Sequence, residues 1–270
     1  MAAPAVPVPA APSPARPVIG EFTDLEPGLS LGVFPSPSPS GISDELIYVL
    51  RADPSQFKLA LGLASETGSL YTAPEWMQQR PDWVAVINAA MFEQDYLSST
   101  FFMQHGEHVN QHKFSKKASN VLVFDPIGEE PQTILDVNCD PWPVERKKYT
   151  SFVQSFRLLD CAGRPTWREN GRIWSHALIG TDREGRLLFI HARSPWSTYE
   201  FTKILQELPI QLRRLQYAEG GPEASLVVRS GGLELQRMGS YETGFNENDD
   251  ANRFYRLPLV LGLVRKGVKR

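Results

Sequence analysis

The pattern of hydrophobic and polar positions along the chain predicts mainly short β-strands. Apolar runs alternate with clusters of glycine, proline, aspartate and serine, which favour turns over long helices. The expected strands are Leu46–Leu50, Phe57–Leu63, Val84–Asn88, Val121–Phe124, Thr133–Val137, Ala177–Gly180, Arg186–His191, Leu215–Ala218, Ser225–Val228 and Leu233–Arg237. Because mostly hairpin-type turns join these strands, we predict an α+β fold with a mixed, mainly antiparallel sheet core.

Only a few short helices are expected beside these strands. Two capping-box patterns, Thr72–Glu75 and Ser197–Glu200, begin two of them, because such residues satisfy the free backbone N–H groups of a first helical turn. The first helix is expected to end near Arg80 and the second before Pro209. A helical spacing of apolar residues indicates another short helix over residues 149–156.

The ends of the chain differ from this body in composition. Residues 1–17 are mostly proline and alanine, so we expect a disordered tail of extended conformations. Residues 18–41 are expected to form an extended lead-in rich in proline and serine, with the compact body beginning near Ile42. The single domain then covers residues 42–264, and a basic tail covers residues 265–270.

The proline-rich tail also bears on cellular location. It lacks the basic start and the uninterrupted apolar stretch of a signal peptide. Its composition is typical of the segment that follows a signal cleavage site. We therefore expect an exported protein, periplasmic or extracellular, whose signal peptide is not part of this chain.

Net charge limits the classes of partner. The 270 residues include 28 lysines and arginines against 31 acidic residues, a formal charge of −3. A general binder of nucleic acid or anionic membranes needs a concentrated positive field, which this balance does not provide. No apolar run is long enough for a membrane-spanning helix. A local basic pocket for one phosphate remains compatible with this charge, and the sequence does not indicate an oligomeric state.

Cysteines and histidines give no strong metal signal. Cys139 and Cys161 are too far apart for a C-x-x-C centre, and they form either one disulfide in an exported protein or two buried thiols. His105, His108 and His112 have a spacing that metal ligands can use, but they lie in a polar segment without an obvious acidic or cysteine partner. We expect surface histidines, no metal and no cofactor.

The first candidate segment for chemistry follows a buried strand. Asn88 ends the strand Val84–Asn88, and the next loop carries Glu93 and Asp95. A strand end would hold Asn88 rigidly, while the loop could bring both acids to a cleft. The alternative interpretation is structural, with Asn88 capping a turn and the two acids in solvent.

The second candidate segment is the glycine turn Glu219–Ser225. Its carboxylate is followed by Gly220 and Gly221, which have no side chains to shield their amides. Such amides can point at an anion or a sugar oxygen. The alternative is a simple turn between two strands.

The third candidate segment, His191–Thr198, runs from a strand end to a helix N-terminus. Free N–H groups at a helix start favour anions, and Arg193 could hold a phosphate with two hydrogen bonds. The alternative is that Arg193 pairs with an acid while Trp196 packs in the core.

These segments, taken together and in this order, resemble the phosphodiester glycosidase family over about residues 80–230. The family's Asn-Ala/Gly-x-Phe strand end corresponds to Asn88–Phe92 with one residue more, and its Gln-x-x-x-Leu segment to Gln154–Leu158. Its capped helix and acidic glycine turn correspond to Ser197–Leu208 and Glu219–Ser225. This chain has Glu219 where the family usually has Asp, Pro222-Glu223 in place of Gly-Ser, and Ser175-His176 where the family usually has an Arg. These departures imply a pocket not tuned to N-acetylglucosamine phosphodiesters.

The resemblance implies a hydrolase that cleaves the bond between a sugar anomeric carbon and a phosphodiester, on an envelope or extracellular glycan. It implies a catalytic carboxylate at Glu219, further acids at Glu93 and Asp95, and His176 as an acid or base. The implied substrate-binding residues are Asn88, Arg157, His191, Arg193, Ser194, Gly220, Gly221 and Ser225. The expected partner is a carbohydrate or sugar phosphate.

Two other functions stay open from the sequence. The first is a secreted glycan-binding protein that keeps the scaffold but has lost catalysis at the substituted turn. The second is a metal-dependent phosphodiesterase that uses His105, His108 and His112.

Overall fold

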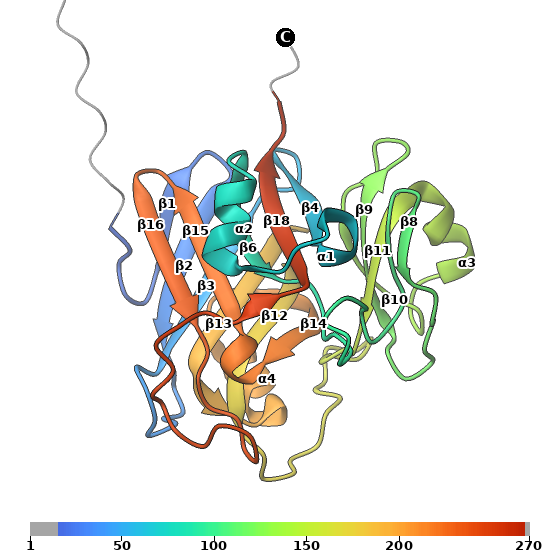
Figure 1. Ribbon diagram of the computed structural model, residues 1–270. Helices are drawn as coiled ribbons and strands as arrows, with labels where there is room; N and C mark the ends of the chain where they lie inside the picture. The colour runs from blue at the N-terminus through green and yellow to red at the C-terminus, as the bar shows by residue number, and fades with distance from the viewer. Residues whose placement is uncertain (1–15, 268–270) are drawn as a thin grey trace, which may run out of the picture.

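Antiparallel pairing joins the strands into three main sheets in the computed structural model, which describes residues 16–267 (Figure 1). The six-stranded sheet consists, in spatial order, of β1 (Phe22–Glu26), β2 (Leu29–Pro35), β3 (Leu46–Ala52), β13 (Leu187–Trp196), β12 (Trp174–Asp182) and β14 (Leu212–Gly220). The central five-stranded sheet consists of β16 (Leu233–Met238), β15 (Ser225–Ser230), β6 (Trp83–Asn88), β18 (Leu259–Arg265) and β4 (Phe57–Leu63). The lateral five-stranded sheet consists of β10 (Thr133–Asp136), β9 (Asn120–Pro126), β11 (Tyr149–Ser155), β7 (Met103–His105) and β8 (His108–Gln111). The short strands β5 (Tyr71–Thr72) and β17 (Arg256–Leu257) form a separate pair.

Helices are few and short, so the α+β prediction is confirmed. The α-helices are α1 (Ala64–Thr67), α2 (Ala73–Gln79), α3 (Trp142–Glu145) and α4 (Thr198–Glu207), with 3-10 turns η1 (Arg146–Lys148) and η2 (Gly221–Glu223). Both predicted capping residues are in place. The Thr72 hydroxyl accepts the Glu75 amide at 3.4 Å, and the Ser197 hydroxyl accepts the Glu200 amide at 3.2 Å.

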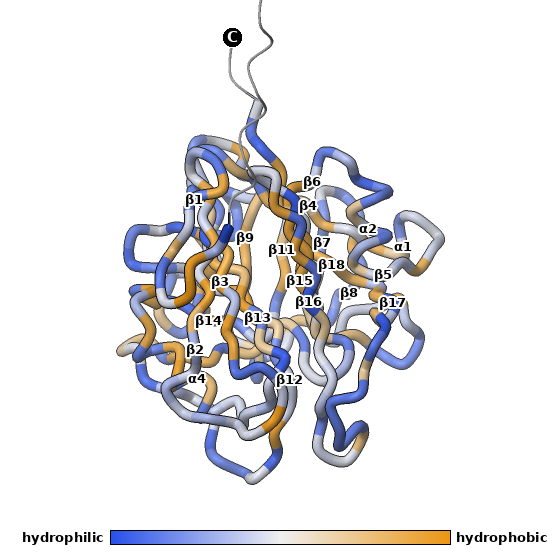
Figure 2. The backbone as a smooth tube through the Cα atoms, turned by 90° about the vertical axis from the view of Figure 1, so that its left-hand side faces the viewer, coloured by the Kyte–Doolittle hydropathy of each residue, from blue (hydrophilic) through white to orange (hydrophobic). Residues whose placement is uncertain are grey.

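Strands at the centre of the six-stranded sheet are buried on both faces, which explains their continuous apolar sequences. In β13, Leu187 and Phe189 point into the main core, which all three sheets share, while Leu188 and Ile190 point to the opposite side. This alternation is the two-residue period of a strand. Figure 2 shows hydrophobic positions gathered along the interior strands and hydrophilic positions in the outer loops.

Two helices cover the outer faces of the sheets. Phe201, Ile204 and Leu205 of α4 pack on the six-stranded sheet. Trp76 and Met77 of α2 pack on the central sheet, where Figure 1 shows α2 against β6 and β15. A short helix therefore covers one face of each of these two sheets. The site described below lies at the edge strand β14.

The helix predicted over residues 149–156 is wrong. Residues 149–155 form β11, which pairs with β9 on one side and β7 on the other. The apolar spacing that suggests a helix also suits a strand buried on both faces, since Phe152 and Val153 enter different apolar clusters. Sheet pairing decides between the two because both neighbouring strands are present.

The expected start of the compact body near Ile42 is also corrected. Strands β1 and β2 lie within the expected lead-in, and β2 pairs with β3 from Leu29 to Pro35. Leu29 and Leu31 are buried in the main core. The prolines at residues 35–39 interrupt the sequence without ending the sheet. At the other end, Arg265 closes β18, while the expected tails at residues 1–15 and 268–270 lie outside the described residues.

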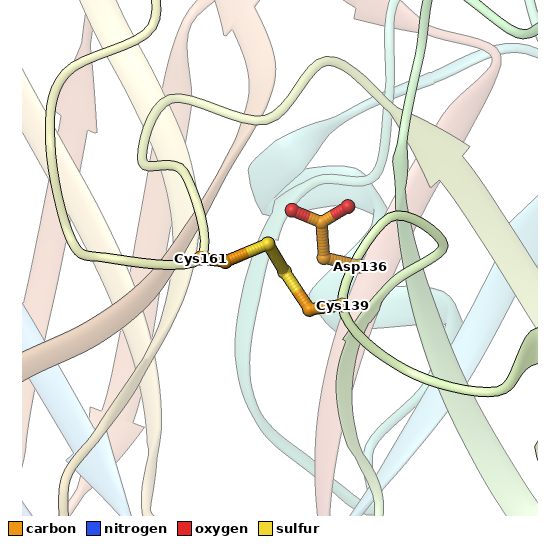
Figure 3. Close-up of side chains that lie close together, drawn as sticks. All are labelled: Asp136, Cys139 and Cys161. Carbon is orange, nitrogen blue, oxygen red and sulfur yellow. A yellow bond between two sulfur atoms is a disulfide. The ribbon is translucent and has the colours of Figure 1, made fainter.

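Within residues 16–267, no helix combines the length and hydrophobicity that crossing a membrane requires. Cys139 and Cys161 form a disulfide with a Cα–Cα distance of 5.8 Å, so of the two expected alternatives the bridge is present. It joins the loop after β10 to a turn near residue 161 (Figure 3). Asp136 lies beside both sulfurs, but sulfurs in a disulfide are not free thiolates, so this trio is not a metal site.

We expect the double variant Cys139→Ser/Cys161→Ser to lower the free energy of unfolding by about 3 kcal/mol. The bridge closes a segment of 22 residues, and loop-closure entropy of this size gives that order of magnitude. Urea unfolding of the wild type with and without reductant, beside the double variant, measures the effect. Equal stability of all three samples would contradict the prediction.

Candidate active site

A cavity of about 550 Å³ opens at the C-terminal end of the edge strand β14. It combines acidic, aromatic and small residues from four separate parts of the chain. The residues that line it are Met91, Phe92, Thr100, Trp167, Asn170, Arg172, Trp174, Tyr217, Glu219, Gly220, Glu223 and Glu242. Of the sequence-predicted site residues, the structure brings Glu219 and Gly220 to this cavity.

Glycine is required where β14 turns into η2, because other groups fill the space a side chain would need. A Cβ at Gly220 would overlap the Tyr217 hydroxyl and come within 2.6 Å of a Trp174 ring carbon. A Cβ at Gly221 would overlap the carboxylate of Glu242, and Gly221 also has a left-handed φ of 64°. The two glycines therefore allow the cavity's acids and aromatic rings to approach the backbone closely.

Asn88 holds the turn that carries Glu223. Its side-chain amide donates to the Glu223 carbonyl at 3.0 Å, and its side-chain oxygen accepts the Ser225 amide at 2.7 Å. The Ser225 hydroxyl also donates to the Glu223 carbonyl at 3.0 Å. Asn88 and Ser225 are buried and do not line the cavity, so both act as positioning residues rather than as substrate contacts.

Three glutamates share the cavity, and none of them is paired with a cation in a salt bridge among the described residues. Burial raises the pKa of Glu219 well above its usual range; the Gly220 amide opposes this shift, whereas the charges of Glu223 and Glu242 add to it. Burial also raises the pKa of Glu223, with Glu242 adding to the shift. These acids therefore hold protons more strongly than solvent carboxyls do.

Glu242 lies nearest to positive charge among the three acids. Burial raises its pKa, but the guanidinium of Arg172 opposes that shift. Glu219 and Glu242 thus have different environments, one without a stabilising cation and one with a cation. Two acids whose environments separate their protonation states are the usual arrangement for a proton donor and a charged partner.

Aromatic rings form one wall of the cavity. Trp167 stacks on Tyr217 at 5.6 Å with an angle of 22° between the rings, and it meets Trp174 edge to face at 6.4 Å. Phe92 lies on the loop that follows β6 and contributes to the same cavity. Burial raises the pKa of Tyr217 well above its usual range, helped by Glu219, so its phenol stays protonated. Apolar rings beside a few polar groups are typical of a small-molecule pocket.

The two predicted histidines are fully buried and do not line the cavity. His176 stacks on Phe201 at 4.4 Å and its Nε2 is 3.0 Å from the Trp196 carbonyl. His191 Nε2 is 3.3 Å from the Ala224 carbonyl. Burial lowers the pKa of each imidazole to about 3. Their placement gives no support to an acid–base role, because both imidazoles are neutral and do not reach the cavity.

The predicted phosphate-binding residues lie elsewhere and already have partners. Arg193 bonds Asp249 at 2.7 Å and the Ala251 carbonyl at 2.9 Å. Ser194 accepts the Glu45 amide at 2.7 Å, and Arg157 pairs with buried Asp136 at 2.8 Å. The strand β13 extends to Trp196, so Arg193 sits within the sheet rather than at the start of α4. The segment His191–Thr198 therefore fits its alternative interpretation, in which Arg193 pairs with an acid.

The predicted acids Glu93 and Asp95 are exposed on the loop after β6 and do not line the cavity. Hydrogen bonds from the amides of Leu97 and Ser98 occupy the Asp95 carboxylate. Ser98 is the main cause of its lowered pKa. Glu93 and Asp95 therefore fit the alternative interpretation of this segment, in which both acids lie in solvent.

The three histidines of the possible metal cluster do not converge. His105 contacts Glu66 at 3.1 Å, and His108 contacts the Ser65 hydroxyl at 3.0 Å, both on α1. Within residues 16–267, the only close group of three metal-ligating atoms is the one that contains the disulfide. The placement of His105, His108 and His112 therefore gives no support to a metal-dependent phosphodiesterase.

Sequence reasoning missed several residues of the cavity. Glu242 and Arg172 lie in loops with no recognisable local motif, and only the folded chain brings them to the turn at Gly221. Trp167 and Trp174 had a usable signal, because two tryptophans flank a polar Asn-Gly turn that cannot be a core strand. Glu223 lay inside the second candidate segment but was not singled out.

A family model described as phosphodiester glycosidase matches residues 82–263 of the chain. This match covers most of the chain and includes every residue that lines the cavity. No curated protein matches the chain by sequence.

Solved structures with the same fold come from a vertebrate and two bacteria. The catalytic domain of zebrafish N-acetylglucosamine-1-phosphodiester alpha-N-acetylglucosaminidase superposes with a TM-score of 0.63 at 12% identity, covering 93% of this chain and 88% of that one. A hypothetical protein from Synechocystis has a TM-score of 0.61 at 12% identity, covering 94% and 64%. A Burkholderia pseudomallei protein predicted to be exported has a TM-score of 0.54 at 11% identity, covering 81% and 74%. At these identities the likeness concerns the fold alone.

We expect Asn88→Ala to loosen the turn between η2 and β15. The variant leaves the Ser225 amide and the Glu223 carbonyl without the Asn88 partner, at a cost of about 1–3 kcal/mol in stability. Hydrogen exchange at the Ser225 amide should become faster. Asn120→Ala is the matched control, because the Asn120 side chain donates to the Leu215 carbonyl at 3.0 Å. Equal Ser225 exchange in both variants would argue against the positioning role.

We expect neither His176 nor His191 to take up a proton between about pH 8 and about pH 5, since ordinary imidazoles titrate within this interval. Both are buried without a charged partner, and their pKa values lie near 3. Imidazole resonances assigned with His176→Gln and His191→Gln variants report the protonation state directly. A chemical-shift change centred near pH 6.5 for either residue would contradict the structure's account of it.

Proposed function

The chain belongs to the phosphodiester glycosidase family, and we propose that it is a hydrolase that cleaves a bond to the anomeric carbon of a sugar in the β14 cavity. The observation that carries this proposal is the group of three glutamates against an aromatic wall. Most enzymes that hydrolyse bonds at an anomeric carbon use two carboxyl groups in different protonation states. Aromatic rings offer apolar faces on which the hydrocarbon face of a sugar ring can pack.

Glu219 is the proposed proton donor. Its burial and its acidic neighbours favour the protonated carboxyl, which can give a proton to the oxygen that leaves the sugar. Glu242 is the proposed charged partner, because the guanidinium of Arg172 opposes the rise in pKa that burial causes there, whereas no cation opposes the rise at Glu219. An ionised carboxylate can activate water or stabilise the positive charge that develops at the anomeric carbon. Glu223 adds negative charge beside Glu219 and so helps keep that proton in place.

The family's description names a phosphodiester as the group attached to the sugar. Arg172 is the cation at this cavity that would face such a group. The proposed setting is an envelope or extracellular glycan, reached after export. The Cys139–Cys161 disulfide supports that setting, since disulfides persist in oxidising compartments.

A glycan-binding protein without catalysis is the second candidate. The wall of Trp167, Trp174 and Tyr217 favours it, because stacking on sugars requires no acid. Product analysis over a panel of glycosides separates the two candidates. Saturable binding with no product, at any pH between about 4 and 8, would select the binding function.

We expect Glu219→Gln to reduce turnover by about 10²- to 10⁴-fold, the usual contribution of a positioned proton donor. Glutamine keeps the shape and the acceptor for the Gly220 amide, which donates to Glu219 Oε1 at 3.0 Å, but it has no acidic proton. The control is Glu107→Gln, which changes an exposed glutamate in the β7–β8 turn. Unchanged hydrolysis by Glu219→Gln would remove Glu219 from the mechanism.

The same variant should be more stable than the wild type at alkaline pH. A carboxyl whose pKa is raised in the folded protein supports folding below its unfolded value and loses that support as pH rises. Glutamine does not ionise, so the stability difference should grow from about pH 5 to about pH 8. Urea unfolding at several pH values measures it. A wild type that is more stable than Glu219→Gln at pH 8 would contradict this assignment.

A further inference from the structure

Two hydrogen-bond donors on aromatic rings lie close together in the wall of the β14 cavity. Trp174 begins β12, Tyr217 lies in β14, and both residues line the cavity. They meet at Gly220, where a Cβ would overlap the Tyr217 hydroxyl and lie 3.0 Å from Trp174 Nε1. The phenolic O–H and the indole N–H therefore approach the same point of the turn, which only glycine allows.

The indole N–H has no acceptor of its own. Trp174 Nε1 is buried and has no hydrogen-bond partner among residues 16–267. Burial raises the pKa of Tyr217 well above its usual range and Glu219 adds to the shift, so the phenol keeps its proton. The Trp174 N–H opposes this shift from beside the phenol oxygen, but its geometry falls short of a hydrogen bond. A buried donor without an acceptor is unfavourable, and a ligand oxygen would remove that cost.

Neighbouring rings hold both donors in place. Trp167 stacks on Tyr217 at 5.6 Å and meets Trp174 edge to face at 6.4 Å. Trp174 also packs on the buried ring of His176 at 5.9 Å. Neither donor ring can turn toward an acceptor elsewhere without breaking this packing. The two donors are therefore preorganised for a ligand in the cavity.

Arg172 adds positive charge at the rim of the same cavity. Its side chain is exposed, and one of its nitrogens donates to the Thr243 carbonyl at 3.2 Å. A guanidinium has five N–H donors, so others are available to a ligand. Burial raises the pKa values of Glu219 and Glu223, which favours their neutral forms and weakens their repulsion of an anion. The cavity therefore suits an anion with several oxygens.

We propose that Tyr217 and Trp174 bind the phosphodiester group of the substrate, the first through its O–H and the second through its N–H, with Arg172 completing the set at the rim. This inference rests on the proposed hydrolase function and names the side chains that recognise its phosphodiester. The non-bridging oxygens of a phosphodiester carry negative charge and accept hydrogen bonds without donating any, so they complement three donors.

The same hydrogen bonds should strengthen during the reaction. As the bond between the anomeric carbon and the bridging oxygen breaks, its electron pair moves onto that oxygen, which then takes the proton of Glu219. A water oxygen bonds to the anomeric carbon, and the proton lost by that water goes to the carboxylate of Glu242. Negative charge grows on the departing phosphate before its protonation is complete, and donors in fixed positions stabilise that charge. Loss of a donor should therefore lower kcat as well as raise KM.

The variants Tyr217→Phe and Trp174→Phe each remove one donor and keep an aromatic ring. The probes are common hexoses and N-acetylhexosamines in both anomeric forms, each as its methyl phosphodiester and as its 4-nitrophenyl glycoside, which carries no phosphate. We expect each variant to lower kcat/KM for the phosphodiester by about 10- to 100-fold, the usual effect of a hydrogen bond to a charged group. For the nitrophenyl glycoside the change should stay below about threefold, because no such bond is lost.

Titration calorimetry gives a readout that does not need turnover. In a Glu219→Gln background, which suppresses hydrolysis, each donor variant should weaken binding of the methyl phosphodiester by about tenfold or more. Binding of the methyl glycoside of the same sugar should not change. Tyr199→Phe in α4 and Trp142→Phe in α3 are the matched controls, because neither residue lines the cavity, and both should keep wild-type affinity.

The outcomes separate this inference from the function beneath it. Equal losses on probes with and without phosphate would indicate a structural role for the two rings and overturn the inference. Unchanged phosphodiester binding in both donor variants would also overturn it, while hydrolysis by the wild type would leave the proposed function intact. Binding that depends on the two donors, without hydrolysis of any probe, would support the inference and remove the hydrolase. A wild type that neither binds nor hydrolyses any phosphodiester of the panel would overturn both.

Discussion

The clamp between Asn88 and the turn after β14 is the interaction on which the site depends. The chain passes there from the six-stranded sheet to the central sheet, from β14 through η2 to β15. Asn88, at the end of β6, fixes both the Glu223 carbonyl and the Ser225 amide. His191 and Gly239 contact the Ala224 carbonyl from other directions. A turn held by partners from several strands can carry acids at fixed positions without help from a ligand.

The turn must be rigid because the acids that it holds close together destabilise one another's ionised forms. Burial of Glu219 beside Glu223 and Glu242 raises their pKa values, which means that the folded protein resists their ionisation. The burial of apolar side chains in the main core, which three sheets share, offsets the unfavourable free energy of burying these acids. Destabilised groups of this kind commonly mark functional sites, because chemistry needs charge states that a purely structural protein would avoid.

The sequence predicted the strand framework and part of the turn, but not the whole cavity. Local patterns identified the capped helices α2 and α4. They also located Asn88 at the end of a strand and Glu219 and Gly220 at a turn, since strand ends and paired glycines have clear local causes. Arg193 was predicted to bind a phosphate near a helix start, because the sequence did not show where β13 ends. In the structure, Arg193 lies within β13 and pairs with Asp249. Arg172 and Glu242 had no local signal, because tertiary contact alone brings their loops to the turn.

The family relationship therefore fixes the scaffold more firmly than the chemistry of the site. At 12% identity to the zebrafish domain the fold is shared, while side chains that face a substrate are free to change. The residues that hold the turn are thus different from those that face a substrate. Only the residues that face a substrate need to differ between relatives with one fold.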